Sequence, residues 1–88
     1  MRKFDYNYKQ KEPDFFDQAV GKPVKVFTKL LDINVCFCYV GILVKKSKDF
    51  VYLKDGRIMK IENDREIETK TFAKVALNKG IISWVEFD

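Results

Sequence analysis

The stretch "CFCYVGILVKKSKDFVYLKDG", residues 36–56, sets a glycine inside a long uncharged run, followed by a charged turn and a second apolar run. No charged side chain occurs in residues 35–44, so a strand formed there must be covered on both faces. A glycine within such a strand marks a sharp bend or a close approach of two backbones, because it has no Cβ. We therefore expect Gly41 to be the corner of the longest and most buried strand.

The two cysteines of this stretch are adjacent on one face of the expected strand. Cys36 and Cys38 lie two apart, which places their Cα atoms about 7 Å from each other. That separation is near the upper limit for a disulfide, so no bridge between them is expected. Because the chain has no histidine and no other cysteine, the pair lacks further ligands for a zinc site. We interpret both residues as small buried hydrophobic side chains beside the bend.

The N-terminal part of the chain combines an alternating segment with a helical one. Residues 1–12 place Phe4, Tyr6 and Tyr8 on one side, which fits either a short edge strand or a mobile arm. The segment "PDFFDQAV" (13–20) predicts a short helix, because proline suits a first turn and acidic residues suit a helix start. The expected organisation is an arm over residues 1–12 and one domain over residues 13–88.

The rest of the chain reads as strands joined by short polar turns. Asp55-Gly56 signals a turn, after which "RIMKIE" (57–62) either returns as a hairpin arm or continues a bent strand. Five stretches are expected to be strands: residues 23–29, 35–44, 50–54, 67–77 and 81–87. A short N-terminal helix followed by about five short strands favours a mostly β fold, namely a five-stranded, strongly bent, SH3-like small barrel.

Composition excludes several classes of protein. The 88 residues carry 17 basic and 13 acidic side chains, and the net charge of +4 permits binding to a polyanion without demanding it. The absence of histidine removes Ser-His-Asp and Cys-His nucleophile pairs, and no phosphate-loop motif occurs. We therefore expect neither an enzyme nor a cofactor. No run approaches the ~18 apolar residues of a membrane span, and no signal peptide is visible, so the expected location is the cytoplasm.

The apolar content exceeds what so small a core needs. Hydrophobic residues make up 47% of the chain, yet a domain of this size buries only roughly 60–65% of its unfolded surface. The strand expected over residues 67–77 is long, proline-free and apolar on one face, so as a free edge it would invite aggregation. A closed cyclic assembly removes such edges and would also cover Trp84 and Phe87. The alternative is that both edges close within one barrel.

Two motifs in this order resemble those of the Sm-like family of small barrels. The first is "YVGIL" (39–43), followed by "VKKSKD" (44–49) and "FVYL" (50–53). The second is "VALNKGIISWV" (75–85), in which a short basic, glycine-containing turn separates two apolar strands. The helix expected before "GKPVKVF" (21–27) also looks like the helix that precedes the first strand in that family.

The resemblance implies a homo-oligomeric ring of about five to seven copies that binds single-stranded RNA. In such a ring the fourth and fifth strands of neighbouring copies pair edge to edge, and two loops of every copy surround the pore. The positions here that match the RNA-binding loops and their surroundings are Lys48, Asp49, Phe50, Tyr52, Asn78, Lys79 and Gly80.

These residue types suit recognition of a single strand. Phe50 or Tyr52 would stack on a base, a contact worth ~1–3 kcal/mol. Asn78 would hydrogen-bond a base edge, and Lys48 and Lys79 would neutralise phosphates. A ring repeats such weak contacts and so strengthens binding through effective concentration.

Two other interpretations stay open at this point. One is a monomeric SH3- or Tudor-type barrel that binds a protein through its exposed aromatic side chains. The other is an Sm-like ring with a structural role and no RNA binding. The structural ring without RNA binding gains support from two departures from the family pattern. Tyr52 lies near a position often held by asparagine, and Lys79-Gly80 stands where bacterial relatives have Lys-His.

Overall fold

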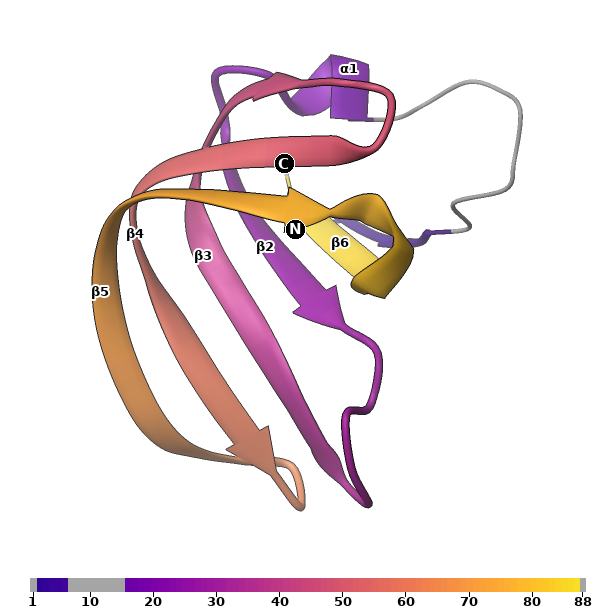
Figure 1. Cartoon of the computed structure of the whole chain (residues 1–88), viewed down its shortest axis with the longest axis vertical. Coiled ribbons are helices and arrows are strands. Elements are labelled where there is room, and N and C mark those ends of the chain that lie inside the picture. The colour runs from indigo at the N-terminus through magenta and orange to yellow at the C-terminus, as the bar shows by residue number, and fades with distance from the viewer. Residues whose placement is uncertain (1, 7–15, 88) are drawn as a thin grey trace.

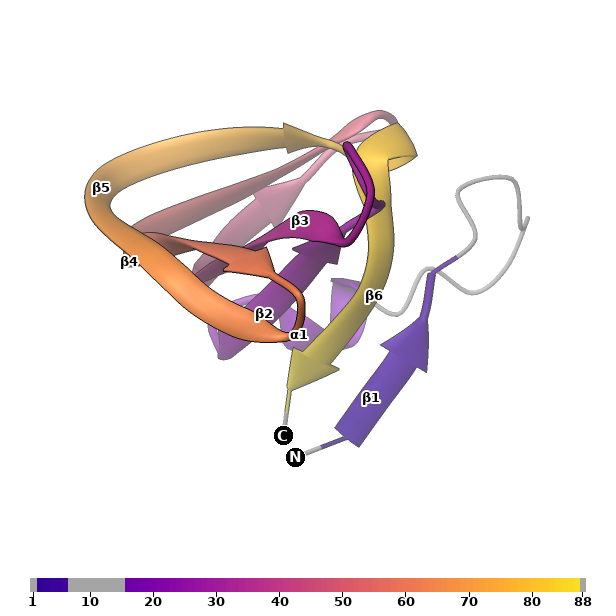
Figure 2. The same cartoon turned by 90° about the horizontal axis from the view of Figure 1, so that it is seen from below.

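The computed structural model describes residues 2–6 and 16–87, and strands account for most of these residues. All the strands belong to one antiparallel sheet, in the order β1-β6-β2-β3-β4-β5 (Figure 1). In chain order the elements are β1 (Arg2–Asp5), α1 (Phe16–Ala19), β2 (Pro23–Thr28), β3 (Val35–Lys46), β4 (Phe50–Glu62), β5 (Arg65–Asn78), the 3₁₀ turn η1 (Lys79–Ile81) and β6 (Ile82–Phe87). Seen from below, the sheet curls from β5 round to β6 (Figure 2).

The mostly β prediction is confirmed, but the sheet has six strands within the described residues rather than five. The additional strand is β1, which pairs antiparallel with β6 from Arg2 opposite Phe87 to Asp5 opposite Trp84. The edge-strand interpretation of the N-terminal segment is therefore the correct one for residues 2–5. The predicted helix is present as Phe16–Ala19, and residues 13–15 of that prediction lie outside the described part.

The bend predicted at Gly41 is confirmed, and its cause is a meeting of two glycines. The expectation that it lies in the longest strand is wrong, because β3 has 12 residues whereas β4 has 13 and β5 has 14. A Cβ on Gly41 would lie 2.9 Å from the carbonyl oxygen of Lys54, and a Cβ on Gly56 would overlap the carbonyl oxygen of Val40. Between the pairs Val40–Arg57 and Ile42–Lys54, β4 carries one residue more than β3. This bulge bends the sheet without ending β4.

The turn signal at Asp55-Gly56 therefore belongs to a continuous strand. Asp55 has a φ of 52°, a left-handed conformation that aspartate tolerates in turns and bulges. Of the two interpretations of residues 57–62, the bent continuation of the preceding strand is correct and the hairpin arm is wrong. As a result β3, β4 and β5 are all long, and each spans both halves of the curved sheet (Figure 1).

The hydrophobic core lies inside the curve of the sheet and is closed at one end by the short helix α1. Phe16 and Ala19 of α1 are completely buried, and Tyr6 packs on Phe16 with 5.1 Å between ring centroids. Phe87 is also fully buried within its own chain, so the expectation that another copy covers it is wrong. The main core residues are Phe16, Ala19, Val24, Val26, Leu43, Val51, Leu53, Leu77, Ile82, Val85 and Phe87.

The opposite side of the sheet carries a smaller apolar cluster. Trp84 stacks on Phe27 with 4.6 Å between ring centroids, and both rings are partly exposed. Cys38 is fully buried, as expected, whereas Cys36 is only half-buried, and both are free thiols. Burial raises the pKa of the Cys38 thiol to about 12, and the positive charges of Lys25 and Arg57 oppose this effect only in part.

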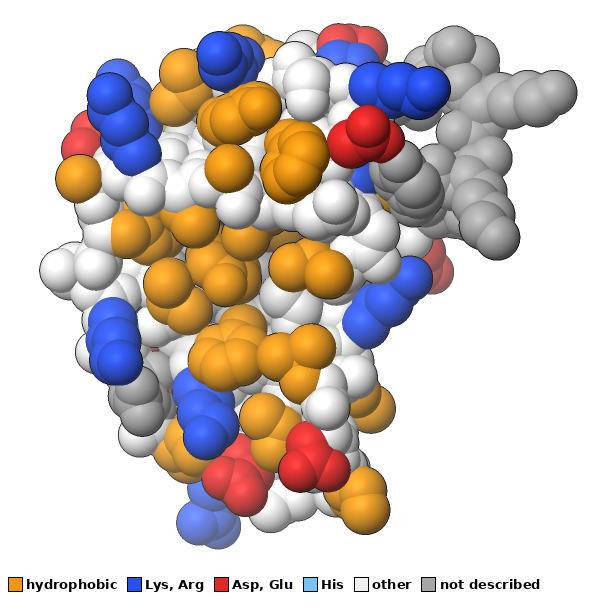
Figure 3. Space-filling view, viewed as in Figure 1, with side chains coloured by type: hydrophobic (Ala, Val, Ile, Leu, Met, Phe, Trp, Pro, Cys, Tyr) orange, Lys and Arg blue, Asp and Glu red, His pale blue; other side chains and the backbone are white. Residues whose placement is uncertain are grey.

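Hydrophobic side chains also reach the surface. They form a band down the middle of the face in Figure 3, over β3, β4 and β5, with charged side chains at its margins. Exposed large hydrophobic residues are Val20, Leu30, Leu31, Ile33, Val44, Phe50, Ile67 and Ile81. Apolar surface is thus left uncovered by a single chain, as the composition predicted.

Candidate nucleic-acid interface

The two loops singled out in the sequence lie side by side in the structure. The backbone amide of Lys79, at the start of η1, donates to the carbonyl oxygen of Asp49 in the β3–β4 turn at 2.8 Å. Next to this bond, Phe50 and Asn78 face each other across β4 and β5. Residues nearly thirty positions apart in the chain therefore form one local surface.

The β3–β4 turn holds Phe50 in place through the side chain of Ser47. The Ser47 amide donates to the Phe50 carbonyl oxygen at 2.8 Å, and the Phe50 amide donates to Ser47 Oγ at 3.2 Å. The Phe50 side chain is 38% exposed, and its ring centroid lies 6.4 Å from that of the half-buried Tyr52. Two neighbouring aromatic rings on one strand are thus partly open to solvent.

Three lysines surround these rings, and pairing across the sheet explains why. Lys45 lies opposite Tyr52, with its Nζ 4.9 Å from the ring centroid, and Lys54 lies opposite Lys74. Directly opposed residues of antiparallel strands share a face of the sheet. We call this surface the basic–aromatic face, which comprises Lys45, Phe50, Tyr52, Lys54, Lys74, Ala76 and Asn78.

The charges on this face suit an anion. Lys45, Lys54 and Lys74 are all exposed. Like charges directly opposite each other destabilise a sheet, so the Lys54–Lys74 pair costs stability that a bound anion would restore. Lys48, in the adjacent turn, is exposed as well and extends the positive region.

The same face is hollowed. A depression of about 660 Å³ is lined by both lysine and apolar residues, so charged groups lie beside an apolar floor. A volume of this size falls within the range of small-molecule pockets. The lining residues are Val44, Lys45, Tyr52, Leu53, Lys54, Lys74, Val75 and Ala76.

The structure places Lys79 differently from the sequence expectation. The residue is only 3% exposed, and its Nζ lies 6.0 Å from the ring centroid of Phe16, beneath α1. In the described chain Lys79 therefore packs against the core instead of pointing to solvent. A contact between Lys79 and a phosphate would require this side chain to leave the helix.

The other predicted residues lie at the margin of the basic–aromatic face. Asn78 is exposed, and its side-chain oxygen accepts a hydrogen bond from the Gly80 amide at 2.7 Å, which leaves the NH₂ group on the surface. Asp49 is half-buried and is held by the bond from Lys79. Gly80 is close-packed, since a Cβ there would lie 2.9 Å from the side-chain oxygen of Asn78.

Sequence reasoning did not single out Lys45, Lys54 or Lys74. A signal for Lys54 was available, because it continues the period-two alternation of Phe50 and Tyr52 along the same strand. Lys45 and Lys74 join the site only through the pairing of β3, β4 and β5, which residue patterns within one strand do not reveal.

Comparison of the chain with models of known protein families, with curated proteins and with solved structures gives no match. Among the described residues, no three histidine, cysteine or acidic side chains lie close enough together to hold a metal ion. The part of the chain that the structure describes also contains no helix with the length and hydropathy needed to cross a bilayer.

Proposed function

We propose that this chain is an Sm-like protein that binds single-stranded RNA on its basic–aromatic face and assembles into a homo-oligomeric ring. The Sm-like assignment is supported by a short helix followed by five strands, paired in the order β6-β2-β3-β4-β5. Further support comes from the bend at Gly41 in a long central strand and from the tight turn at Lys79–Ile81 between the last two strands.

The observation that carries RNA binding is the placement of two aromatic rings among exposed lysines around one hollow. An unpaired base would stack on a partly exposed ring such as Phe50, and Lys54 and Lys74 on the same face would offer positive charge to the phosphates of the strand. This combination of a stacking platform and a positively charged groove is typical of proteins that bind single strands.

The unpaired edge of β5 supports assembly of copies. Within the described residues, β5 pairs only with β4, so its outer edge carries no strand. That edge belongs to a strand of 14 residues without proline, which makes pairing with another chain favourable. In a ring the basic–aromatic face would be repeated in every copy, so weak contacts would act together on one RNA.

The test of RNA binding is the affinity for fluorescent oligouridine and oligoadenine at several salt concentrations. Each lysine that contacts a phosphate contributes about −0.7 to the slope of log affinity against log salt for single strands. We expect Lys54→Ala to weaken binding about three- to ten-fold at low salt and to reduce this slope. Phe50→Ala removes stacking, so we expect about ten-fold weaker binding with an unchanged slope.

Arg65→Ala serves as the matched control. Arg65 is exposed and lies at the opposite end of β5 from Asn78, so the variant loses the same charge away from the proposed site. Equal weakening by Arg65→Ala and Lys54→Ala would show nonspecific attraction and contradict the site. No binding of either RNA at low salt would contradict the function.

A monomeric SH3- or Tudor-type module that binds protein is the second candidate. The specific observation in its favour is β1, which already covers the edge of β6 that ring formation would use. A monomer with no salt-dependent affinity for RNA would support this candidate. A ring that binds no oligonucleotide would instead indicate a structural role.

A further inference from the structure

The edge of β6 is already occupied by a strand of the same chain. β1 pairs with β6 through four residue pairs and lies on the far side of β6 from β2 (Figure 2). The proposed ring needs this same edge for β5 of the neighbouring copy. β1 and a second copy therefore compete for one set of backbone hydrogen-bonding groups on β6.

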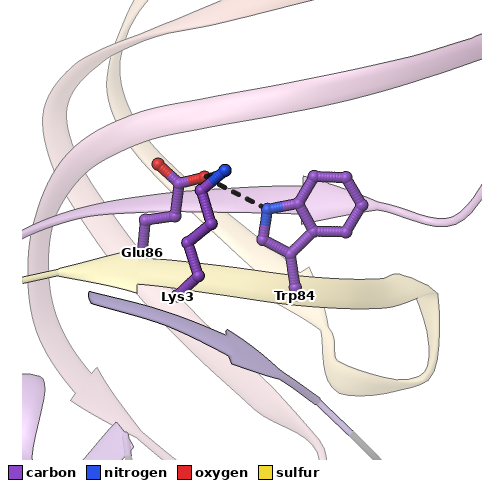
Figure 4. A network of polar contacts seen from close by, with 3 residues as sticks. All are labelled: Lys3, Trp84 and Glu86. Atoms are coloured by element: carbon purple, nitrogen blue, oxygen red, sulfur yellow. Dashed lines mark hydrogen bonds and ion pairs between the residues drawn. The ribbon is translucent and has the colours of Figure 1, made fainter. Parts of the chain in front are cut away.

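Specific contacts hold β1 on this edge. Lys3 Nζ lies 3.7 Å from Glu86 Oε2, and the indole nitrogen of Trp84 donates to the same oxygen at 3.3 Å (Figure 4). The Glu86 side chain is only 11% exposed, whereas that of Lys3 is 73% exposed. A largely buried carboxylate thus depends on β1 for part of its charge compensation.

The backbone and rings that follow β1 extend these contacts. The Tyr6 amide donates to the Ser83 carbonyl oxygen at 2.9 Å, and the Tyr6 ring packs on Phe16 of α1. The attachment of β1 therefore reaches from the edge of β6 to the end of the core that α1 covers.

The two competitors differ in length and in concentration. β1 has 4 residues, whereas β5 has 14 residues and an outer edge without a strand in the described chain. β1 belongs to the same molecule, and attachment within one molecule gives effective concentrations of order millimolar. A second copy at micromolar concentration must overcome that advantage through its longer pairing.

We propose that β1 is a detachable latch: while it lies on β6 it blocks edge-to-edge pairing, and its release opens β6 to β5 of a second copy. This inference rests on the ring assembly proposed above. The surface that it assigns is the outer edge of β6, and the partner is another copy of this chain. Protein concentration and the charge of Lys3 then control assembly.

The test is light scattering of the full chain and of Lys3→Glu over a range of micromolar concentrations. Lys3→Glu places two carboxylates together, which weakens β1 on β6 while changing a residue that lies mostly in solvent. We expect Lys3→Glu to assemble at a concentration at least ten-fold lower than the full chain requires. A second variant that lacks residues 1–6 should assemble at a similarly low concentration. Because the two variants release β1 in different ways, the test remains possible if one of them does not fold.

Two matched controls separate the latch from general charge effects. Lys3→Arg keeps the ion pair and should assemble only at the concentrations that the full chain requires. Lys48→Glu makes the same charge change in the exposed β3–β4 turn and should also assemble only at the concentrations that the full chain requires.

The remaining outcomes each decide a different proposal. A full chain that is already a ring, with unchanged variants, would overturn the latch and leave the ring proposal standing. Monomers throughout would overturn both the latch and the ring. RNA affinity is measured separately on the same proteins, so the proposal of RNA binding is tested independently of the assembly results.

Discussion

Gly41 and Gly56 show how two residues without a Cβ determine the curvature of the sheet. They come from β3 and β4, and the ring of Phe72 closes over both. Any side chain at Gly56 would overlap the backbone of β3, because the carbonyl oxygen of Val40 occupies that space. The two strands can bend together only while both positions remain glycine.

Gly56→Ala is therefore expected to destabilise the fold by about 3 kcal/mol or more, since the backbone must move to admit a methyl group. Urea unfolding followed by circular dichroism measures the loss. Gly21→Ala is the control: Gly21 has a φ of 86° but open space around it, so only about 1 kcal/mol of backbone strain is expected. Similar midpoints for the two variants would contradict the close approach of the strands.

Cys38 provides a pH-dependent contribution to stability. Its pKa in the folded protein is raised to about 12, chiefly by burial, whereas an unfolded cysteine titrates near pH 8.5. The folded state disfavours the thiolate, so this contribution is complete below about pH 8.5 and declines as the pH rises toward 12. We expect the free energy of unfolding to fall less steeply between pH 8 and 11 in Cys38→Ala than in the unmodified chain.

Cys36→Ala is the matched variant for that measurement. Cys36 is only half-buried, although burial raises the pKa of its thiol too. Its removal should flatten the pH dependence less than removal of Cys38. The reverse order would show that Cys38 is accessible to water.

At the scale of elements, the turn η1 links the core to the candidate site. Its first residue, Lys79, lies beneath α1, while Asn78, just before it, belongs to the basic–aromatic face and caps the turn. The bond from Lys79 to Asp49 then ties η1 to the β3–β4 turn. A short element thus fixes the relative position of two loops that are far apart in the chain.

Asn78→Ala should lower stability by about 1 kcal/mol, because the Gly80 amide loses its acceptor. Asn78→Asp keeps an acceptor oxygen and should fold with nearly unchanged stability. If Asn78 also donates to a base edge, Asn78→Asp should still weaken RNA binding, since it removes the NH₂ group and adds a negative charge. Unchanged RNA affinity in Asn78→Asp would restrict Asn78 to its capping role.

At the scale of the whole molecule, stability and the proposed binding depend on different aromatic residues. Phe16 is fully buried and closes the open end of the curved sheet, whereas Phe50 is 38% exposed at the surface. An 88-residue domain has little stability to lose. The core at this end therefore relies on Phe16 and Ala19, from a helix of 4 residues.

Phe16→Ala is expected to cost about 3–5 kcal/mol, as large-to-small substitutions of buried aromatic residues do. Phe50→Ala should cost less than about 1 kcal/mol, since the ring is partly solvent-exposed. Thermal unfolding of both variants measures the difference. A large loss in Phe50→Ala would assign that ring to the core and weaken its proposed role in stacking.

The residue pattern by itself determined the strand-rich class, the short helix before the first long strand, and the bend at Gly41. These features follow from local chemistry: alternation of apolar and polar side chains defines a half-buried strand, and a glycine in an uncharged strand permits a bend. The family resemblance singled out the two loops, and the structure shows that Phe50 and Asn78 face each other across β4 and β5.

Only the tertiary structure decided which segments meet. It paired β1 with β6, set Gly56 against Gly41, buried Lys79 under α1, and brought Lys45 and Lys74 to the rings of the candidate site. These outcomes depend on pairing between strands distant in the chain and on a bulge that shifts their alignment. Spacing along a single strand carries no information about either, because register is a property of two strands together.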